Sequence, residues 1–307
     1  MKVIKINHHQ KKYAETVAKD REELGKRPEW LKVRLPSGQN YKDVHKLMRN
    51  SKLNTVCEEA RCPNIAECWN SRTATFMILG DTCTRSCGFC NINVGLPNEL
   101  DLDEPRRVAE SVQELNLRHV VITSVNRDEL KDGGASIFSE SIRLIREKMP
   151  DTTIEILIPD FKGEEHAFEI IMQNPPDILN HNLETVSRLY HAVRPQAKYE
   201  RSLELIRWFK DRGLRTKSGI MVGIGEKKEE IVELMDDLYA HGCDVMTIGQ
   251  YLQPTKNHLP VDRFVTLDEF KFYKDYGIKL GFMAVESSPL VRSSYHADKH
   301  ARLVDKK

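Results

Sequence analysis

The chain has 307 residues, of which 40% are hydrophobic, and its 47 lysines and arginines nearly balance its 46 aspartates and glutamates. This length and composition suffice for one large α/β domain or two smaller ones, and the balanced charge argues against a surface for nucleic acid or anionic membranes. No stretch is as apolar as a signal peptide or a membrane span, so we expect a cytoplasmic protein.

Residues 1–73 show no regular alternation of strand and helix patterns. We expect an extension with a turn around the motif RPEWLKVRLPSG and one helix within residues 40–56. The stretch from residue 5 to 27 is rich in charge, which is typical of a solvent-exposed helix face. The alternative for this stretch is a segment that docks a partner.

The extension ends in three closely spaced cysteines, Cys57, Cys62 and Cys68, within the motif CEEARCPNIAEC. In a reducing compartment, clustered cysteines are more often metal ligands than disulfides. Three thiols packed in an apolar core are the alternative, but the motif is charged and polar. We therefore expect a metal centre here.

From residue 74 onward, apolar β-branched runs alternate with segments of helical spacing. The expected strands span residues 74–80, 119–125, 153–159, 177–183, 216–223, 245–252 and 279–285. The expected helices carry apolar residues at helical spacing: Val108, Val112 and Leu115; Phe138, Ile142, Ile145 and Met149; Tyr199, Leu203 and Ile206; and Ile231, Leu234 and Leu238. Thr266 and Glu269 predict a capping box for the last helix. Such units favour a parallel β/α barrel, and a doubly wound sheet is the alternative.

A second group of cysteines, Cys83, Cys87 and Cys90, follows the first expected strand in the motif CTRSCGFC. In a β/α barrel, this loop opens onto the face where active sites are built. A structural zinc site needs four ligands, and the loop offers no histidine and no second C-x-x-C pair. A [4Fe–4S] cluster normally takes four thiolates, so three leave one iron open to another ligand. We expect an iron–sulfur cluster.

The spacing Cys83-x3-Cys87-x2-Cys90 after a first strand resembles the signature of the radical S-adenosylmethionine superfamily. The resemblance implies that the open iron binds S-adenosylmethionine through its amine and carboxylate. It also implies that an electron from the cluster cleaves this cofactor into methionine and a 5′-deoxyadenosyl radical, which removes hydrogen from an unactivated C–H bond.

Longer blocks resemble the lipoyl synthase family from about residue 27 to 298. Besides both cysteine groups they are RPEWLK, CEEARCPN, ATFMILG, VVITSVNRDELKDGGA, NHNLETV, TKSGIMVGIGE, GQYLQP and VRSSYHA. The resemblance implies that Cys57, Cys62 and Cys68 hold an auxiliary [4Fe–4S] cluster. It also implies a fourth, serine ligand from the motif VRSSYHA, for which the candidates are Ser293 and Ser294 and the favoured one is Ser294. An oxygen ligand suits a cluster that must come apart, because it binds soft metals poorly.

The resemblance further implies a sulfurtransferase of lipoate biosynthesis. Two sulfur atoms would enter at C6 and C8 of an octanoyl chain on a carrier-protein lysine, with two molecules of S-adenosylmethionine used and the auxiliary cluster as sulfur donor. The implied partners are octanoylated carriers (glycine cleavage H protein and E2 lipoyl domains), a flavodoxin or ferredoxin as electron donor, and cluster-assembly proteins. Other sulfur-inserting radical enzymes, such as biotin synthase or a methylthiotransferase, and a non-catalytic zinc-stabilised binding module are the alternatives.

The expected fold is a partial parallel TIM barrel of (β/α)6 type with extensions that carry the auxiliary cluster. Its expected parts are an N-terminal extension (1–73), the barrel (74–285) and a C-terminal segment with the serine ligand (286–307).

Polar residues at strand ends are the expected contacts of S-adenosylmethionine: Ser124, Asn126, Asn182, Glu184 and Lys217. Glu184 suits the ribose hydroxyls and Lys217 the methionyl carboxylate, while a helix cap or a surface ion pair is the alternative for each.

Four further features have an ordinary structural explanation. We expect His181 to be hydrogen-bonded without a catalytic role, and Cys243 to be a packed thiol. Gly133–Gly134 predict a turn before a helix, and the glycines of residues 223–226 predict the end of a strand.

Overall fold

The computed structural model describes residues 10–11, 14–15, 27–31, 38–51, 53–59, 62–70 and 75–294. The chain divides into two compact units. Unit 1 combines residues 1–32, 86–91 and 181–293, and unit 2 combines residues 33–85, 92–180 and 294–307. The division places the two halves of the CTRSCGFC motif in different units, because it falls between Arg85 and Ser86.

Unit 2 contains a run of hydrogen-bonded strands in the order β1-β2-β5-β6-β7. The short β1 pairs with β2 in the antiparallel sense, and the others are parallel. Their bounds are β1 Asn54–Thr55, β2 Thr75–Ile78, β5 His119–Ser124, β6 Thr153–Leu157 and β7 Ile178–Asn180. Every residue of β2 and β7 is buried, as expected for parallel strands covered on both faces. The first four expected barrel strands are confirmed, with shorter bounds.

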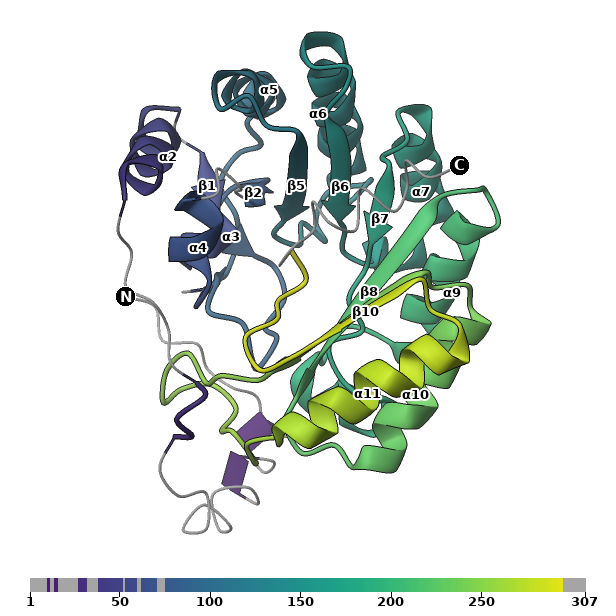
Figure 1. The fold of residues 1–307 in the computed structure, drawn as a ribbon. Coiled ribbons are helices and arrows are strands. Elements are labelled where there is room, and N and C mark those ends of the chain that lie inside the picture. Colours follow the sequence, from purple (N-terminus) through teal and green to yellow (C-terminus); the bar gives the residue numbers. More distant parts are fainter. Residues whose placement is uncertain are drawn as a thin grey trace. The chain divides into compact units, whose positions relative to one another are not determined.

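Helices of unit 2 follow its strands in sequence. Figure 1 shows α5, α6 and α7 next to one another along this part of the sheet, and α6 contacts both of its neighbours. Their bounds are α5 Glu104–Glu114, α6 Ala135–Lys148 and α7 Glu165–Gln173, and a 3-10 turn, η2 Phe161–Gly163, precedes α7. The predicted helices around Val108 and Ile142 are confirmed, and Gly134 is the N-cap of α6, with φ of 91°. No helical pattern had pointed to α7, which buries only Ala167, Phe168 and Ile171.

The N-terminal part of unit 2 contains the predicted helix and two short ones that the sequence did not suggest. They are α2 Gln39–Asn50, α3 Val56–Glu59 and α4 Ile65–Asn70. Trp69 of α4 is fully buried, and its ring lies 5.1 Å from that of Tyr41 in α2, so an aromatic contact joins the two helices. Most of the charged stretch from residue 5 to 27 lies outside the described residues.

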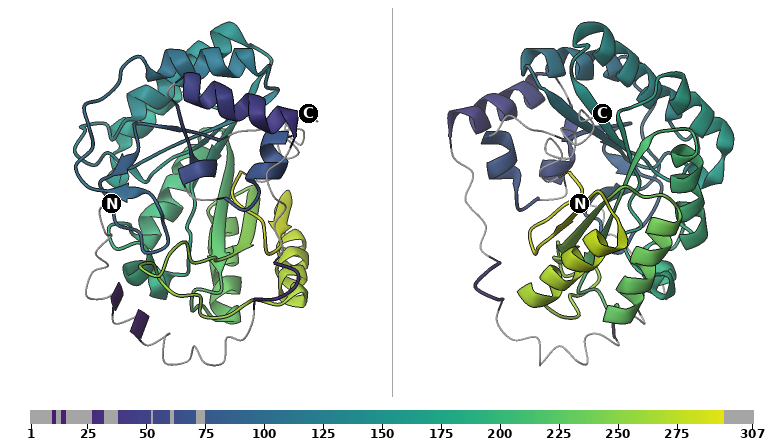
Figure 2. Two further views of the ribbon diagram at one scale, coloured as in Figure 1. Left: turned by 90° about the vertical axis from the view of Figure 1, so that its left-hand side faces the viewer. Right: turned by 45° about the vertical axis from the view of Figure 1, so that its right-hand side comes forward.

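Unit 1 contains three parallel strands in the order β8-β9-β10. The strands are β8 Arg215–Val222, β9 Val245–Gln250 and β10 Ala284–Ser287; the helices are α8 Tyr190–Val193, α9 Tyr199–Lys210, α10 Lys228–Ala240 and α11 Leu267–Leu280, and η3 Ser187–Leu189 is a 3-10 turn. The helices predicted around Leu203 and Leu234 are confirmed as α9 and α10. Figures 1 and 2 show α10 and α11 side by side, with α11 against β10.

The strand predicted for residues 279–285 was misplaced. Helix α11 continues to Leu280, and Gly281 ends it with φ of 120°, a left-handed conformation that favours glycine. β10 therefore begins only at Ala284. The predicted capping box at the other end of α11 is confirmed: Thr266 Oγ1 accepts the Glu269 N–H at 3.2 Å, and Glu269 Oε2 accepts the Thr266 N–H at 3.1 Å.

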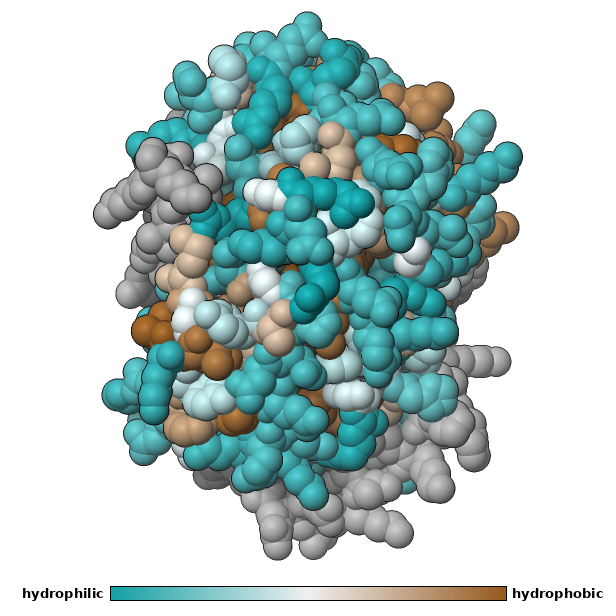
Figure 3. Space-filling model, turned by 90° about the vertical axis from the view of Figure 1, so that its right-hand side faces the viewer, coloured by the Kyte–Doolittle hydropathy of each residue, from teal (hydrophilic) through white to brown (hydrophobic). Residues whose placement is uncertain are grey.

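The helices turn their apolar sides toward the strands and their polar sides toward solvent. The face drawn in Figure 3 is accordingly largely hydrophilic, with hydrophobic residues in small groups between polar ones. Among the described residues, no helix is both long and apolar enough to span a membrane.

Candidate active site

The end of β2 is held in place by two buried charged side chains. Leu79 has φ of 69°, and its N–H donates to Glu104 Oε2 at 2.7 Å. Its carbonyl accepts from Arg127 Nη1 at 3.0 Å. Burial raises the pKa of Glu104 to about 7, and the bond from Leu79 opposes that shift. These two bonds therefore fix the backbone at Leu79, immediately before the loop that carries Cys83.

Cys83 lies in a short parallel pairing of β3 Thr82–Cys83 with β4 Asn93–Val94. Its Sγ accepts two backbone N–H groups, from Arg85 at 3.4 Å and from Asn126 at 3.3 Å. Hydrogen bonds to a ligand sulfur tune the potential of an iron–sulfur cluster. The surroundings of Cys83 therefore fit a cluster ligand.

The two residues after Cys83 attach the loop to the rest of unit 2. Thr84 contributes its N–H and its hydroxyl, and both donate to the Asn126 carbonyl, at 3.0 and 3.1 Å. Arg85 is buried and forms ion pairs with Asp128 at 2.7 Å and with Asp160 at 2.6 Å. Sequence reasoning missed this arginine, although its place between two cysteines was a signal.

Cys87 and Cys90 belong to unit 1, where Gly88 between them is held by two backbone bonds. Its N–H donates to Val193 at 2.9 Å, and its carbonyl accepts from Leu259 at 2.9 Å. A Cβ at Gly88 would lie only 2.7 Å from Leu259 Cδ1, so this close approach requires glycine. The Cys90 N–H donates to the Cys87 carbonyl at 3.2 Å, which closes a tight turn between the two thiols.

In the first cysteine group, Cys57 lies on the short helix α3, Cys68 lies on α4, and Cys62 lies between these helices in the sequence. The Cys62 N–H donates to the Cys57 carbonyl at 2.9 Å, so the backbone brings this pair close. Burial, together with the neighbouring Cys62 thiol, raises the pKa of Cys57 to about 11. Cys62 and Cys68 are half-buried, as is Ser294, which belongs to the same unit.

The donor chemistry of both groups fits iron–sulfur clusters, although no metal site is preformed among the described residues. No three cysteine, histidine or acidic side chains there are arranged to hold one metal ion. None of the seven cysteines, all of which are described, forms a disulfide. Burial keeps the proton on the Cys57 thiol, and a bound metal would displace it.

Three of the predicted cofactor contacts present buried oxygens that accept no hydrogen bond. They are Ser124 Oγ, Asn126 Oδ1 and Asn182 Oδ1. A buried polar atom without a partner costs free energy, and such atoms in native proteins call for an explanation. A polar ligand that donates hydrogen bonds would satisfy each of them, so each residue fits the role of a cofactor contact.

The other two predicted contacts, both in unit 1, are a half-buried glutamate and a buried lysine. Glu184 has φ of 68° and accepts from Asn182 Nδ2 at 3.0 Å. Burial raises the pKa of Glu184, and the positive charges of Arg194 and Arg292 oppose this shift. Lys217 on β8 is fully buried. Both charges lie in surroundings where a bound polar ligand would interact strongly with them.

The hydrogen bond expected of His181 and the packed thiol expected of Cys243 are both present. His181 is buried, and its Nε2 lies 3.0 Å from Ser202 Oγ. Cys243 is buried, and its thiol donates to the Val245 carbonyl at 3.3 Å. β8 ends immediately before Gly223, where Glu226 accepts the N–H groups of residues 223 and 224.

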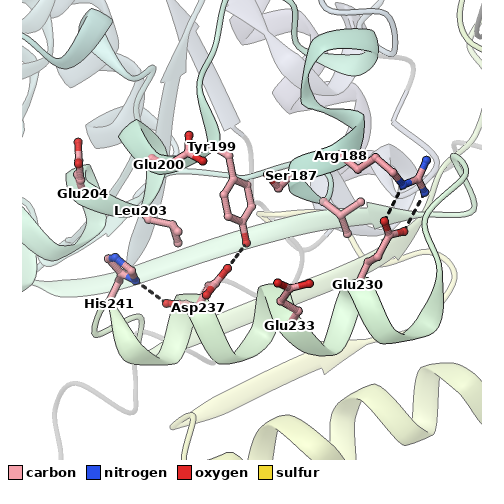
Figure 4. A pocket seen from close by; sticks show the side chains of 11 residues that line it. Ser187, Arg188, Tyr199, Glu200, Leu203, Glu204, Glu230, Glu233, Asp237 and His241 are labelled. Carbon is pink, nitrogen blue, oxygen red and sulfur yellow. Dashed lines mark hydrogen bonds and ion pairs between the residues drawn. The ribbon is translucent and has the colours of Figure 1, made fainter.

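A cavity of about 690 Å³ in unit 1 contains none of the predicted site residues. Figure 4 shows that its lining comes from η3, α9 and α10 and that much of it is acidic. Tyr199 donates to Asp237 at 2.8 Å, and Arg188 pairs with Glu230 at 2.6 Å. These bonds occupy the two acids within the protein.

Comparison with known proteins gives the family. A model of the Radical SAM superfamily matches residues 77–238, and a model of the N-terminal domain of lipoyl synthase of the Radical SAM family matches residues 3–62. A lipoyl synthase of Rubrobacter xylanophilus is 60% identical over 90% of this chain and 88% of its own length. One of Oceanobacillus iheyensis is 57% identical over 89% and 88%.

The chain belongs to the lipoyl synthase family. As a member of this family it is a radical S-adenosylmethionine enzyme that inserts sulfur, with S-adenosylmethionine and iron–sulfur clusters as cofactors.

Solved structures confirm the fold. Streptococcus suis SuiB bound to S-adenosylmethionine matches with a TM-score of 0.56 and 15% identity, over 81% of this chain and 61% of that one. Methylornithine synthase matches with a TM-score of 0.52 and 15% identity, over 90% of this chain and 76% of that one. At such low identity the likeness concerns the fold alone. The predicted partial β/α barrel is confirmed.

Proposed function

We propose that this enzyme inserts two sulfur atoms, at C6 and C8 of an octanoyl chain that is amide-linked to a lysine of a carrier protein. The observation that carries the proposal is the presence of two cysteine groups, each one ligand short of a four-thiolate cage. The group of Cys83, Cys87 and Cys90 leaves one iron open for S-adenosylmethionine. The group of Cys57, Cys62 and Cys68 leaves one iron for a serine ligand that is easily lost. When bound, the first cluster supplies the electron that cleaves S-adenosylmethionine, and the second supplies sulfur.

Each cysteine group has its own task in this proposal. Cys83, Cys87 and Cys90 hold the radical-generating cluster, and the two N–H groups on Cys83 Sγ support that role. The auxiliary cluster is held by Cys57, Cys62, Cys68 and Ser294. Ser294 is favoured over Ser293 because it belongs to the same compact unit as these three cysteines, whereas Ser293 belongs to the other unit.

The polar residues at the strand ends bind S-adenosylmethionine. Ser124, Asn126 and Asn182 accept its hydrogen bonds, as their free buried oxygens suggest. Lys217 pairs with the methionyl carboxylate, because it is a buried cation. Glu184 accepts from the ribose hydroxyls, for which an ionised carboxylate is the better acceptor.

Partners and location complete the proposal. The substrates are octanoylated carriers, namely the glycine cleavage H protein and E2 lipoyl domains. A flavodoxin or ferredoxin supplies electrons, and cluster-assembly proteins restore the sulfur donor. We place the enzyme in the cytoplasm, a reducing compartment where clustered cysteines serve as metal ligands rather than as disulfides. The extension of residues 1–73 and the segment of residues 286–307 serve the auxiliary cluster.

One anaerobic experiment tests the proposal. The reconstituted protein is incubated with an octanoylated lysine peptide, S-adenosylmethionine and reductant, and the peptide is analysed by mass spectrometry. We expect two added sulfurs, which carry the isotope when the clusters are built from labelled sulfide. We also expect about eight irons per chain, from two clusters of four. Stoichiometric zinc with negligible iron, or a product without labelled sulfur, would overturn the proposal.

A further inference from the structure

Arg85 of the motif CTRSCGFC belongs to a buried ion-pair network that has no role in the proposed reaction. Arg85 is 4% exposed and donates to both Asp128 oxygens, from Nε at 2.7 Å and from Nη2 at 2.8 Å. Its Nη2 also lies 2.6 Å from Asp160 Oδ1. We call Arg85, Asp128 and Asp160 the Arg85 clamp.

The clamp joins loops that follow three neighbouring strands of unit 2. Arg85 follows β2, Asp128 follows β5 and Asp160 follows β6. The planar guanidinium suits this role, because its fixed fork can bind two carboxylates at once. Asp160 is fully buried, so it depends on Arg85 to offset the cost of its desolvation.

The same loops form the surroundings of Cys83 Sγ. One N–H that reaches the sulfur belongs to Arg85 itself, and the other belongs to Asn126, two residues before Asp128. Thr84 binds the Asn126 carbonyl, and its hydroxyl accepts the Asp128 N–H at 3.1 Å. Every group that directs an N–H at the sulfur is therefore fixed by the clamp or by Thr84.

We propose that Arg85 is a positioning residue for the radical-generating cluster, which it serves by holding two backbone N–H groups on the sulfur of Cys83. The inference rests on the proposed function of Cys83 as a cluster ligand. Hydrogen bonds to a ligand sulfur withdraw electron density and favour the reduced, more negative cluster. Loss of this arrangement lowers the reduction potential of the cluster.

Two variants and one control test the inference in the full-length reconstituted enzyme. Arg85→Lys keeps the charge and removes the fork, and Thr84→Val removes the hydroxyl that joins the two loops without leaving a buried charge unpaired. Arg146→Lys is the control, because the half-buried Arg146 pairs with Asp177 at 2.8 Å and donates to the Thr152 carbonyl rather than to the loops around Cys83.

The reduction of each variant is followed by electron paramagnetic resonance, on the part of the signal that changes when S-adenosylmethionine is added. This part reports the radical-generating cluster rather than the auxiliary one. In both variants we expect the one-electron equilibrium to shift about tenfold toward the oxidised cluster, which corresponds to a reduction potential lower by about 59 mV. The control is expected to keep the wild-type potential, and all proteins to keep their iron content.

The outcomes separate the inference from the proposed function. Unchanged potentials in Arg85→Lys and Thr84→Val, with a wild-type enzyme that forms 5′-deoxyadenosine, would overturn the inference alone. A wild-type protein that binds no iron through Cys83 would overturn the proposed function first. If Arg85→Lys does not fold, the reduction potential measured for Thr84→Val alone tests the inference. An equal shift in the Arg146→Lys control would show a general loosening of the unit and contradict a specific role.

Discussion

Gly88 and Gly95 lie close together in the sequence but differ in the space around them. A Cβ at Gly88 would lie 2.7 Å from Leu259 Cδ1, whereas at Gly95 its nearest neighbour would be Thr82 Cγ2 at 3.7 Å. Contacts below 3.0 Å force neighbouring atoms to move, and 3.7 Å is an ordinary van der Waals distance. Of these two glycines, only Gly88 is required by packing.

We therefore expect Gly88→Ala to destabilise the protein by about 1–3 kcal/mol, because the Leu259 side chain must leave its position. Gly95→Ala is the matched control and should change stability by less than about 0.5 kcal/mol. Urea unfolding of the metal-free proteins measures both. Equal stabilities of the two variants would show that the loop around Gly88 adapts without cost.

Glu104 makes stability depend on pH. Its pKa of about 7 in the folded state lies above the value of about 4.3 for an exposed glutamate. Between these values the folded protein retains a proton that the unfolded chain releases. The stability that this carboxyl contributes is therefore fully present below about pH 4.3 and is lost as the pH rises to about 7.

Glu104→Gln should remove this dependence and still accept the Leu79 N–H. As the pH rises from 5 to 8, the free energy of unfolding of the variant should increase relative to that of the wild type, by at most about 2–3 kcal/mol. Urea unfolding of both metal-free proteins at several pH values measures the difference. Parallel stability curves for the two proteins would contradict the assignment.

At the scale of the element, the ends of α11 explain both a success and an error of prediction. The capping box of Thr266 and Glu269 is a local pattern, so the sequence was enough to place the start of the helix. Its end depends on Gly281, which stands within the apolar run KLGFMAV. Such a run is compatible with a strand or with a buried helix, and its first two residues, Lys279 and Leu280, belong to α11.

Thr266→Ala removes the cap of α11 and should cost about 1 kcal/mol, because the Glu269 N–H loses its acceptor. Thr266→Ser keeps the hydroxyl and is the matched control. Thermal unfolding followed by circular dichroism compares the three proteins. A serine variant as unstable as the alanine variant would exclude capping as the cause.

At the scale of the whole molecule, the two cysteine groups should be separable by substitution. Cys87→Ala should abolish 5′-deoxyadenosine formation, because the electron source is lost. Cys62→Ala should still cleave S-adenosylmethionine but add no sulfur to the octanoyl peptide. Cys243→Ala is the control and should bind iron as wild type does, since its thiol is packed and bonded to a carbonyl. Lipoyl product from Cys62→Ala at the normal rate would contradict the donor assignment.

The amino-acid sequence was enough to predict the order of the main strands and helices, the two cysteine groups and the family. These features depend on spacing along the chain, and spacing is local information. The pairing of Arg85 with Asp128 and Asp160 is visible only in the folded chain, as is the burial of Glu104 against Leu79. These partners lie far apart in sequence, and their contacts arise when parallel strands bring successive loops to one end of the sheet.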